Sequence, residues 1–320
     1  MSENWRPAAS LATLRARAEL MDAVRRFFRE RGLLEVETPL LSAAAGTDPN
    51  LEPLHTRYEG PEAPSDGLLY LHTSPEFPMK RLLAAGSGPV WQISRVFRGG
   101  ERGPRHNPEF TMLEWYRPGW DHRALMVEVA ELVAAVAGPR PVRERTHAEA
   151  FASLGVDPHR DDAAALDAAA RANGVTPPDG LERDALLDLL FSHAVAPELG
   201  HGRIEFVHDF PAEQAALARV REGDPPVAER FECYLDGMEI ANGFHELADA
   251  AEQRRRFVAD QQRRRARGQP VPPVDERLLA ALQAGLPDCA GVALGLDRLF
   301  MVALGARRID EVLAFPLERA

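Results

Sequence analysis

The chain has 320 residues, of which 45% are hydrophobic and 27% charged, a composition typical of a globular protein and not of a disordered one. Asp and Glu outnumber Lys and Arg by 49 to 38, and the net charge of −11 disfavours a large nucleic-acid footprint. The sequence has no run of eighteen apolar residues, no signal-peptide pattern and only two distant cysteines. We therefore expect a cytoplasmic protein without a membrane span, a disulfide framework or a zinc ribbon.

The first predicted element is a long amphipathic helix over residues 10–31, whose apolar residues recur at helical spacing on one face. Ser10 can cap the start of this helix, and Gly32 can end it in the left-handed conformation. Residues 33–37 then predict a strand that stops before Pro39.

Strands are expected to dominate residues 69–117. Residues 91–97 and 110–117 predict an antiparallel hairpin closed by a long polar loop. Residues two apart on a strand share a face, which places four side chains of the second strand together: Phe110, Met112, Glu114 and Tyr116. A carboxylate on this apolar face is costly unless a cation pairs with it, so Glu114 is a candidate functional residue.

Residues 146–200 are rich in Ala, Asp and Leu and predict a series of small helices. No Ser/Gly-rich linker bounds them, so we interpret them as an insertion packed on a single domain that spans residues 1–320.

Strands return at residues 204–208 and 230–235, and the Asp236-Gly237 pair predicts a hairpin turn into a returning strand or loop over 238–245. The remaining chain predicts helices over 248–267 and 275–285, a short segment at 291–294 and a helix from Asp297. Strands and helices without strict alternation favour an α+β fold with a mixed, mostly antiparallel sheet flanked by helices, and not a doubly wound dinucleotide fold.

Several common chemistries lack their motifs. The sequence contains no GxxxxGK[ST] loop, no GxGxxG after a strand, no GxSxG and no HExxH, and its ten histidines show no zinc-ligand spacing. Hydride transfer, serine-hydrolase chemistry and P-loop hydrolysis are therefore disfavoured.

Three segments carry candidate chemistry, and the first covers residues 95–117. Arg98 lies at the end of the first hairpin strand, where its planar guanidinium could clamp a phosphate. The alternative is a hairpin with an exposed charged loop and a satisfied core glutamate.

The second segment covers residues 237–247. Its oxygen-bearing side chains, Glu239, Asn242 and Glu246, could hold a hard cation. The alternative is a hairpin with solvated carboxylates.

The third segment covers residues 291–298. Small residues at 291, 293 and 295 let a flat ligand approach the backbone, and Arg298 in the first helical turn could stack on an aromatic base. A buried strand that carries Gly and Ala for packing is the alternative.

Two further features receive no catalytic role. The arginine runs at 254–256 and 263–265 are interpreted as a solvated helix face, with a docking surface for an acidic protein or RNA as the alternative. His245 and the two cysteines are expected only to pack.

Together, these segments resemble the motifs of class II aminoacyl-tRNA synthetases in order and spacing. The helix, strand and Pro39 resemble motif 1, the dimer-interface element, residues 98–116 resemble motif 2, and residues 291–298 resemble motif 3. Within this class, residues 105–114 and 238–247 are similar to lysyl-tRNA synthetase.

Motif 1 begins at about residue 10, which leaves no room before it for the anticodon-binding domain of lysyl-tRNA synthetases. In this respect the chain resembles the elongation factor P–(R)-β-lysine ligase family, a truncated relative of those synthetases. The strings that carry this closer similarity are residues 73–76, 106–118, 227–232, 243–247 and 287–289.

The resemblance implies an enzyme that uses ATP and Mg²⁺ to activate (R)-β-lysine, or a related diamino acid, and transfers it to a lysine of elongation factor P. It implies catalytic roles for Arg98 and Arg298 and a homodimer. The implied nucleotide site contains Arg98, Gly99, Gly100, Glu101, Asn107, Glu239, Ile240, Gly295 and Arg298. The implied amino-acid site contains Ser74, Pro75, Glu76, Glu114, Tyr116, Asn242 and Glu246, with Mg²⁺ on Glu239 and Glu246.

Two positions depart from the synthetase pattern. Gly100 stands where motif 2 of lysyl-tRNA synthetase has a glutamate, and Glu101 follows it. Either Glu101 contacts the adenine edge from a shifted loop or the backbone replaces that contact. Ala293 stands where motif 3 has glycine, and one methyl group on the pocket floor changes amino-acid fit by about 1–3 kcal/mol.

Other functions stay open from sequence alone. These are a lysyl-tRNA synthetase-like enzyme that charges tRNA, a tRNA-independent diamino-acid ligase acting on a free small molecule, and a non-enzymatic regulatory paralogue. The acidic net charge and the expected lack of an anticodon domain disfavour tRNA.

Overall fold

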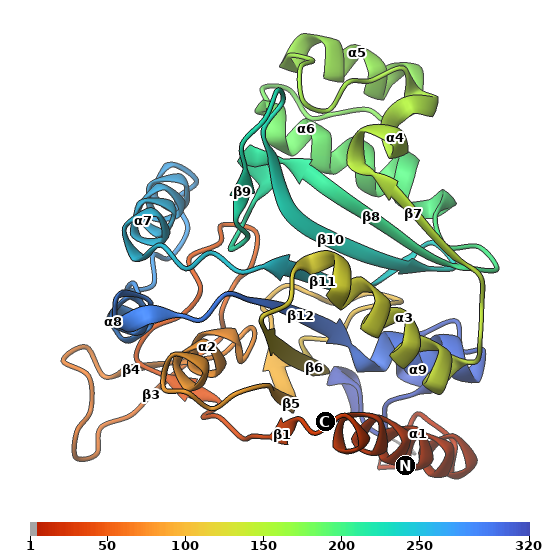
Figure 1. The fold of residues 1–320 in the computed structure, drawn as a ribbon. Coiled ribbons are helices and arrows are strands. Elements are labelled where there is room, and N and C mark those ends of the chain that lie inside the picture. The colour runs from red at the N-terminus through yellow and green to blue at the C-terminus, as the bar shows by residue number, and fades with distance from the viewer. Residues whose placement is uncertain (1–4) are drawn as a thin grey trace.

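The computed structural model describes residues 5–320, and a nine-stranded sheet lies at its centre (Figure 1). The strands of this sheet are β1 (Leu34–Glu35), β5 (Val90–Phe97), β6 (Glu109–Pro118), β7 (Val142–Thr146), β8 (Ile204–Pro211), β9 (Val220–Arg221), β10 (Val227–Leu235), β11 (Met238–His245) and β12 (Cys289–Gly295). A three-stranded sheet beside it contains β2 (Leu41–Ser42), β3 (His55–Arg57) and β4 (Leu68–Leu71). The α-helices are α1 (Leu11–Glu30), α2 (Glu76–Ala84), α3 (His122–Ala137), α4 (His147–Phe151), α5 (Ala163–Ala172), α6 (Arg183–Leu190), α7 (Ala250–Ala266), α8 (Glu276–Gly285) and α9 (Leu296–Leu304).

The large sheet is mixed and mostly antiparallel. Its order is β1–β5–β6–β12–β11–β10–β8–β7, with β9 paired to β10. The pairs β1·β5 and β7·β8 are parallel, and the other neighbours are antiparallel. The predicted α+β fold with a mostly antiparallel sheet and flanking helices is therefore confirmed.

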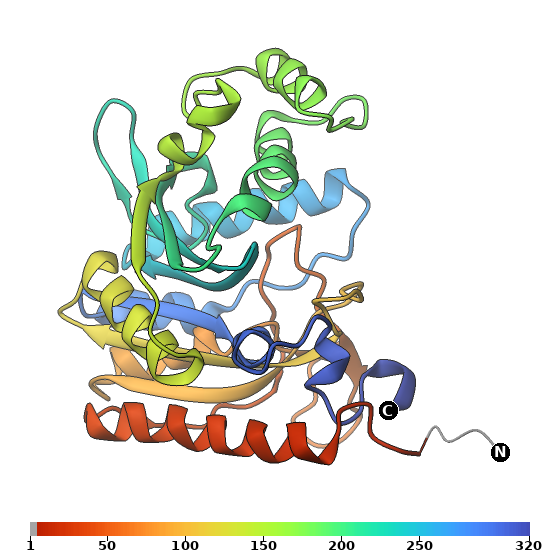
Figure 2. The same cartoon turned by 90° about the vertical axis from the view of Figure 1, so that its right-hand side faces the viewer.

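One face of the sheet is covered by α1, α3 and α9, and Figure 2 shows α1 running along the strands. Phe28 of α1 is fully buried, with its ring stacked on Trp91 at 4.8 Å and tilted against Trp115 at 5.2 Å. Ser10 caps α1 through the amide of Thr13, and Gly32 follows it at φ +71°, as predicted.

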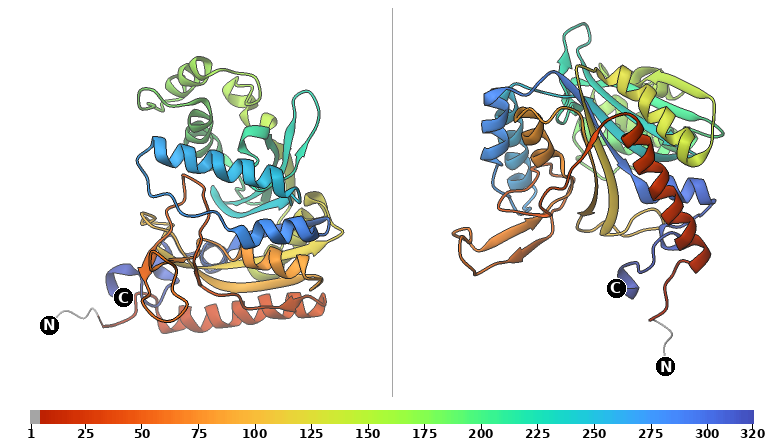
Figure 3. Two further views of the ribbon diagram at one scale, coloured as in Figure 1. Left: turned by 90° about the vertical axis from the view of Figure 1, so that its left-hand side faces the viewer. Right: turned by 60° about the horizontal axis from the view of Figure 1, so that its bottom comes forward.

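The opposite face carries two separate helical layers. Helices α2, α7 and α8 pack over one end of β5, β6 and β12, and Figure 3 shows them side by side. The helices between residues 147 and 198 form a second layer over β8 and β10, which fits the helices predicted for residues 146–200. Central strands of the sheet remain uncovered between the two layers.

The hairpins were well predicted, but one helix was missed. Strands β5 and β6 pair antiparallel as expected, and Asp236 and Gly237 adopt the positive φ angles of a tight hairpin turn. The expectation that strands dominate residues 69–117 is wrong for α2, and the expected strand at 33–37 shortens to two residues. Pro75 and Pro78 concealed α2 in the sequence, although proline is tolerated in a first helical turn.

Along residues 5–320, no helix has both the length and the apolar character needed to span a bilayer. Both cysteines are free and buried, which agrees with a packing role.

The stacked aromatic cluster gives a stability prediction. Phe28→Ala should lower the free energy of unfolding by about 3–5 kcal/mol, because it leaves a cavity between two buried tryptophan rings. Leu11→Ala, on the same helix but at a residue that is 66% exposed, should change it by less than about 0.5 kcal/mol. Urea unfolding followed by tryptophan fluorescence measures both, and equal effects of the two substitutions would contradict the packing described here.

Candidate active site

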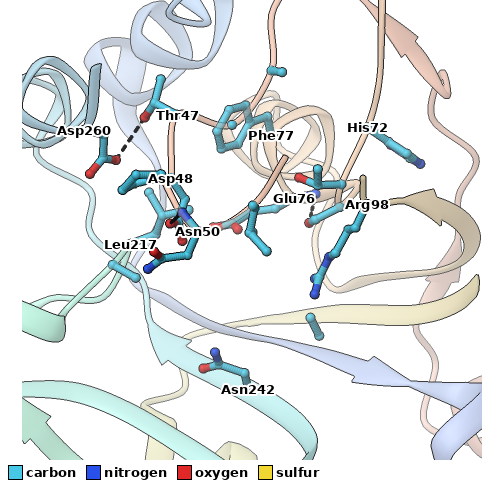
Figure 4. A pocket seen from close by; sticks show the side chains of 18 of the residues that line it. Thr47, Asp48, Asn50, His72, Glu76, Phe77, Arg98, Leu217, Asn242 and Asp260 are labelled. Atoms are coloured by element: carbon cyan, nitrogen blue, oxygen red, sulfur yellow. Dashed lines mark hydrogen bonds between the residues drawn. The ribbon is translucent and has the colours of Figure 1, made fainter. Parts of the chain in front are cut away.

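A cleft of about 1090 Å³ lies on the open face of the sheet. Strands β6, β11 and β12 contribute to its floor, while α2, α6 and α7 contribute to its walls. Figure 4 shows Glu76 and Arg98 on one side of the cleft and Asn242 on the strand across from them. A smaller space of about 20 Å³, here called the inner cavity, adjoins the cleft. Its lining consists of Glu76, Glu114, Tyr116, Asn242, Phe244, Glu246, Gly291, Val292 and Ala293.

Strand register brings the inner-cavity residues together from distant parts of the sequence. Ala293 of β12 stands opposite Glu114 of β6 on one side and Asn242 of β11 on the other. Residues paired across neighbouring strands present their side chains on the same face, so these three form a row. Gly291 keeps the cavity open, because a Cβ there would lie 2.2 Å from the Tyr116 ring and 2.4 Å from a Glu246 oxygen.

Glu114 is the most deeply buried acid of the cavity, with 1% exposure. Its Oε1 accepts a hydrogen bond from Ser74 Oγ at 2.6 Å, and its Oε2 accepts one from the Tyr116 hydroxyl at 3.1 Å. These partners are hydroxyl groups and not a basic side chain. Burial raises the pKa of Glu114 to about 8, and the charge of Glu76 acts in the same direction. In the free protein at neutral pH, Glu114 is therefore mainly protonated, and a cation entering the cavity would favour its ionised form.

Lys80, the sole lysine of the chain, contacts two acids of the cavity lining and was not identified from the sequence. Its Nζ lies 2.6 Å from Glu76 Oε1 and 2.5 Å from Glu246 Oε2, and its side chain is 1% exposed. Burial lowers the pKa of Lys80, but the two carboxylates outweigh this effect and raise it above its ordinary value. The signal was present in the sequence, since Glu76 and Lys80 are four residues apart and share a helix face.

The structure corrects the predicted metal pair. Glu239 and Glu246 are seven residues apart along an extended strand, which separates their backbones by about 23 Å at roughly 3.3 Å per residue. They cannot hold one ion together, and Glu246 is instead paired with Lys80.

A different acid faces Glu239 across the β10–β11 hairpin. Glu239 pairs in register with Tyr234, two residues after Glu232, and both glutamates line the cleft. Burial raises the pKa of Glu232 to about 7, with the Glu239 charge adding to this effect and Arg230 opposing it. Glu232 also contacts Arg230 and the Tyr234 hydroxyl. The sequence predicts the hairpin turn at 236–237, and such a turn places Glu232 and Glu239 on paired neighbouring strands, which could have identified them.

Arg98 and Arg298 both line the cleft but differ in how firmly they are held. The Arg98 guanidinium lies over the Phe110 ring at 5.2 Å and 3.6 Å from Glu101, and its buried Nε has no hydrogen-bond partner. Arg298 donates from Nη1 to the backbone oxygen of Glu239 at 2.9 Å, and its Nη2 lies 2.7 Å from His106 Nε2. Arg98 is therefore the more available of the two cations.

The remaining predicted residues fall into two groups. Ser74, Glu101, Asn107, Ile240 and Gly295 line the cleft, whereas Pro75, Gly99 and Gly100 are not part of its wall. Both polar atoms of the Asn107 side chain are engaged within the chain, since Nδ2 donates to Glu109 O and Oδ1 accepts from the Leu317 amide. The Gly99 amide donates to Glu52 O at 2.7 Å. Through these contacts, Asn107 and Gly99 hold the loop between β5 and β6 in place.

The solvated-face interpretation of the arginine runs is wrong for Arg264, which is fully buried. Its guanidinium donates to Thr47 O at 3.0 Å, to Asp48 O at 2.7 Å and to Leu51 O, and it pairs with Glu52 at 3.2 Å. Thr47 in turn donates to Asp260 (dashed in Figure 4). Arg264 therefore fixes the loop that borders the cleft opposite the sheet.

Comparison with known proteins agrees with this geometry. Residues 4–319 match the family described as tRNA synthetases class II (D, K and N). The chain is 53% identical to a protein of Klebsiella pneumoniae subsp. pneumoniae over 326 residues and 51% identical to one of Salmonella arizonae over 325 residues. Each alignment covers 100% of both chains, and both relatives are named elongation factor P–(R)-beta-lysine ligase.

The buried charges around Lys80 give a pH-dependent prediction. Lys80→Met should lower the free energy of unfolding by about 3–5 kcal/mol at pH 8.5, because it leaves two carboxylates without their cation. The loss should be smaller at pH 6, since the folded variant would then hold a proton on a carboxylate that the unfolded chain releases. Urea unfolding at both pH values measures this, with Arg81→Met on the exposed side of the same helix as the control. A loss that does not change with pH would contradict the ion-pair arrangement.

Proposed function

Because the chain belongs to the class II tRNA synthetase family, we propose that it activates (R)-β-lysine or a related diamino acid with ATP and transfers it to a lysine of elongation factor P. The observation that carries this proposal is the inner cavity. Three carboxylates line it and the Lys80 ammonium contacts two of them, so this group of four side chains has a net charge of −2 when all three carboxylates are ionised. A ligand with two ammonium groups matches this charge.

The cavity also supplies selectivity. A diamino acid can give Glu114 a cationic partner, whereas a monoamino acid of similar length leaves this ammonium–carboxylate pair unformed and Glu114 protonated. Loss of one partner of a buried ion pair costs about 3–5 kcal/mol, which corresponds to more than a hundredfold discrimination. Ala293, which lines both the cleft and the cavity, adds a methyl group to the floor beside Glu114.

In the first step, a carboxylate oxygen of the amino acid attacks the α-phosphorus of ATP, and pyrophosphate leaves. The chain's role is to position both reactants and to stabilise the negative charge that develops on the phosphoryl oxygens. Arg98, with its unengaged Nε at the cleft wall, is suited to bind the α-phosphate. Arg298, held between Glu239 and His106, offers a fixed cation on the nucleotide side.

Glu232 and Glu239 fit a magnesium site, because they are two carboxylates that face the same cleft across a hairpin. Mg²⁺ held there would neutralise phosphate charge. The negative charges of both glutamates would favour its binding, and the raised pKa of Glu232 predicts that binding weakens below about pH 7.

In the second step, the amine of the acceptor lysine attacks the carbonyl carbon of the adenylate. An amide bond forms, the bond to the phosphate oxygen breaks, and AMP leaves while the amine loses a proton. The open side of the cleft supplies access for this acceptor.

We propose further that the enzyme is a cytoplasmic homodimer. Leu34, Leu40 and Leu41 are between 40% and 55% exposed in the segment that resembles motif 1, and a second copy could cover them. The two free cysteines suit a reducing compartment.

The first test is the intact mass of elongation factor P after incubation with this protein, ATP, Mg²⁺ and (R)-β-lysine. The expected result is a mass gain of one lysyl unit, with tRNA uncharged in a parallel reaction that contains α-lysine. Arg98→Ala should abolish the gain, because the transition-state charge loses its guanidinium partner. Charged tRNA together with unmodified elongation factor P would favour a synthetase, and neither product would favour a regulatory paralogue.

Glu114 gives a second, independent test. At pH 7, binding of a diammonium ligand should release close to one proton, because the ligand charge lowers the raised pKa of Glu114. Calorimetric titration of (R)-β-lysine in buffers of different ionisation enthalpy measures this release. Glu114→Gln should release about one proton fewer than the wild type and should lower ATP–pyrophosphate exchange about a hundredfold or more while the fold survives. Full exchange activity in Glu114→Gln would refute the role of Glu114.

A further inference from the structure

A second cluster of chemically active side chains lies on the face of the sheet away from the cleft. It consists of His122 at the start of α3, Glu229 on β10 and His245 at the end of β11. Phe244 and Glu246 line the active-site spaces, so His245 between them points to the opposite face. Glu229 stands beside it, because Arg230 pairs in register with Phe244. One ligand atom from each of the three residues lies within 4.8 Å of the others.

His245 has a carboxylate at each ring nitrogen. Glu229 Oε2 lies 2.7 Å from Nδ1, and Asp288 Oδ1 lies 2.9 Å from Nε2. A neutral imidazole carries one N–H group and can donate only one hydrogen bond. The second contact therefore requires either a second proton, on the ring or on a carboxylate, or a metal ion between the ring and a carboxylate.

His122 favours the second explanation. It is 2% exposed, and neither of its ring nitrogens has a hydrogen-bond partner. Leaving buried polar atoms unpaired is costly, and native structures rarely contain such groups without a ligand, ion or water. His122 lies near His245, with the ring centroids 6.4 Å apart.

We propose that His122, Glu229 and His245 bind a zinc ion. Two imidazoles and one carboxylate, with water completing the coordination, form a ligand set found in zinc enzymes. Zinc–ligand bonds of about 2.1 Å place tetrahedral ligand atoms about 3.4 Å apart. His245 Nδ1 and Glu229 Oε2, now 2.7 Å apart, would therefore separate slightly, while the His122 ligand atom, within 4.8 Å of them, would move closer.

The surroundings of the cluster define which atoms are available. Arg221 Nη1 lies 3.3 Å from Glu229 Oε1, which leaves Oε2 for the ion. Asp288 Oδ1 lies 2.9 Å from His245 Nε2, and with the proton on Nε2 this contact orients the ring to ligate through Nδ1. Asp209 lies 4.0 Å from His122 but is held by Arg221 at 3.0 Å and by Arg123 at 3.7 Å, so we exclude it from the ligand set.

The site would have a structural role. It would tie the start of α3 to the ends of β10 and β11, directly behind the part of β11 that carries Asn242 and Phe244. This inference does not depend on the proposed ligase function, because none of its three ligands lines the cleft or the inner cavity.

Equilibrium dialysis of the intact protein against micromolar Zn²⁺, with millimolar Mg²⁺ present to occupy the Glu232–Glu239 site, tests the proposal. The wild type should bind one zinc ion per chain, and X-ray absorption should show two imidazole ligands. His122→Ala should weaken zinc binding at least tenfold, whereas the matched control His193→Ala, at an exposed histidine, should not change it.

Glu229→Gln, checked for folding by circular dichroism, provides a second variant and should also weaken binding at least tenfold. Zinc bound equally by the wild type and both cluster variants would overturn the proposal. A preformed site should bind zinc with roughly micromolar affinity. Absence of binding to the wild type at 100 µM free zinc would therefore also overturn the proposal.

Discussion

The placement of three carboxylates around one small cavity, with Glu114 and Glu246 buried and Glu76 half-buried, is the constraint on which the site depends. An isolated ionised carboxylate is too costly to remove from water, so each needs a hydrogen bond, a proton or a cation. The chain uses all three means. Lys80 compensates Glu76 and Glu246, hydroxyls from Ser74 and Tyr116 bond to Glu114, and burial keeps a proton on Glu114. Glu114 has no cation among these partners, and a positively charged ligand can supply one.

The sheet makes this concentration of acids possible. Glu114, Ala293 and Asn242 come from three strands, and antiparallel register places them in one row. Gly291 is required beside that row, since a Cβ would overlap both the Tyr116 ring and the Glu246 carboxylate. The helices on the other face, anchored by Phe28 against Trp91 and Trp115, hold these strands in place. The core and the cavity are therefore two sides of the same strands.

Features encoded locally could be predicted from the sequence. The capped helix α1, the β5–β6 hairpin and the Asp236-Gly237 turn each depend on residues close in the chain, and all three predictions are confirmed. Glu76, Glu114 and Glu246 were also identified as acids of one site, and the structure brings them together.

Features that depend on strand register or on tertiary charge pairing could not be predicted in the same way. The pairing of Glu239 with Glu246 was wrong because proximity in sequence was taken as proximity in space along an extended strand. Lys80 and Arg264 were missed because a basic residue on a helix is ordinarily solvated, and only the folded chain shows the carboxylates and carbonyls that bury them. Similarly, His122 and His245 have no ligand spacing in sequence and meet only through the packing of α3 on the sheet.

Strand β11 carries residues of the cleft on one face and His245 of the second cluster on the other. Its alternation places Asn242 and Phe244 on the cleft side and His245 on the other, so a one-residue change of register would exchange the two sets. Pairing with β10 and β12 over most of its length opposes such a shift. On the far side, contacts from Glu229 and Asp288 to the His245 ring add polar restraint where the strand ends. The His245 ring, held behind β11 by these two carboxylates, therefore supports the register on which the inner cavity depends, although His245 lines neither the cleft nor the cavity.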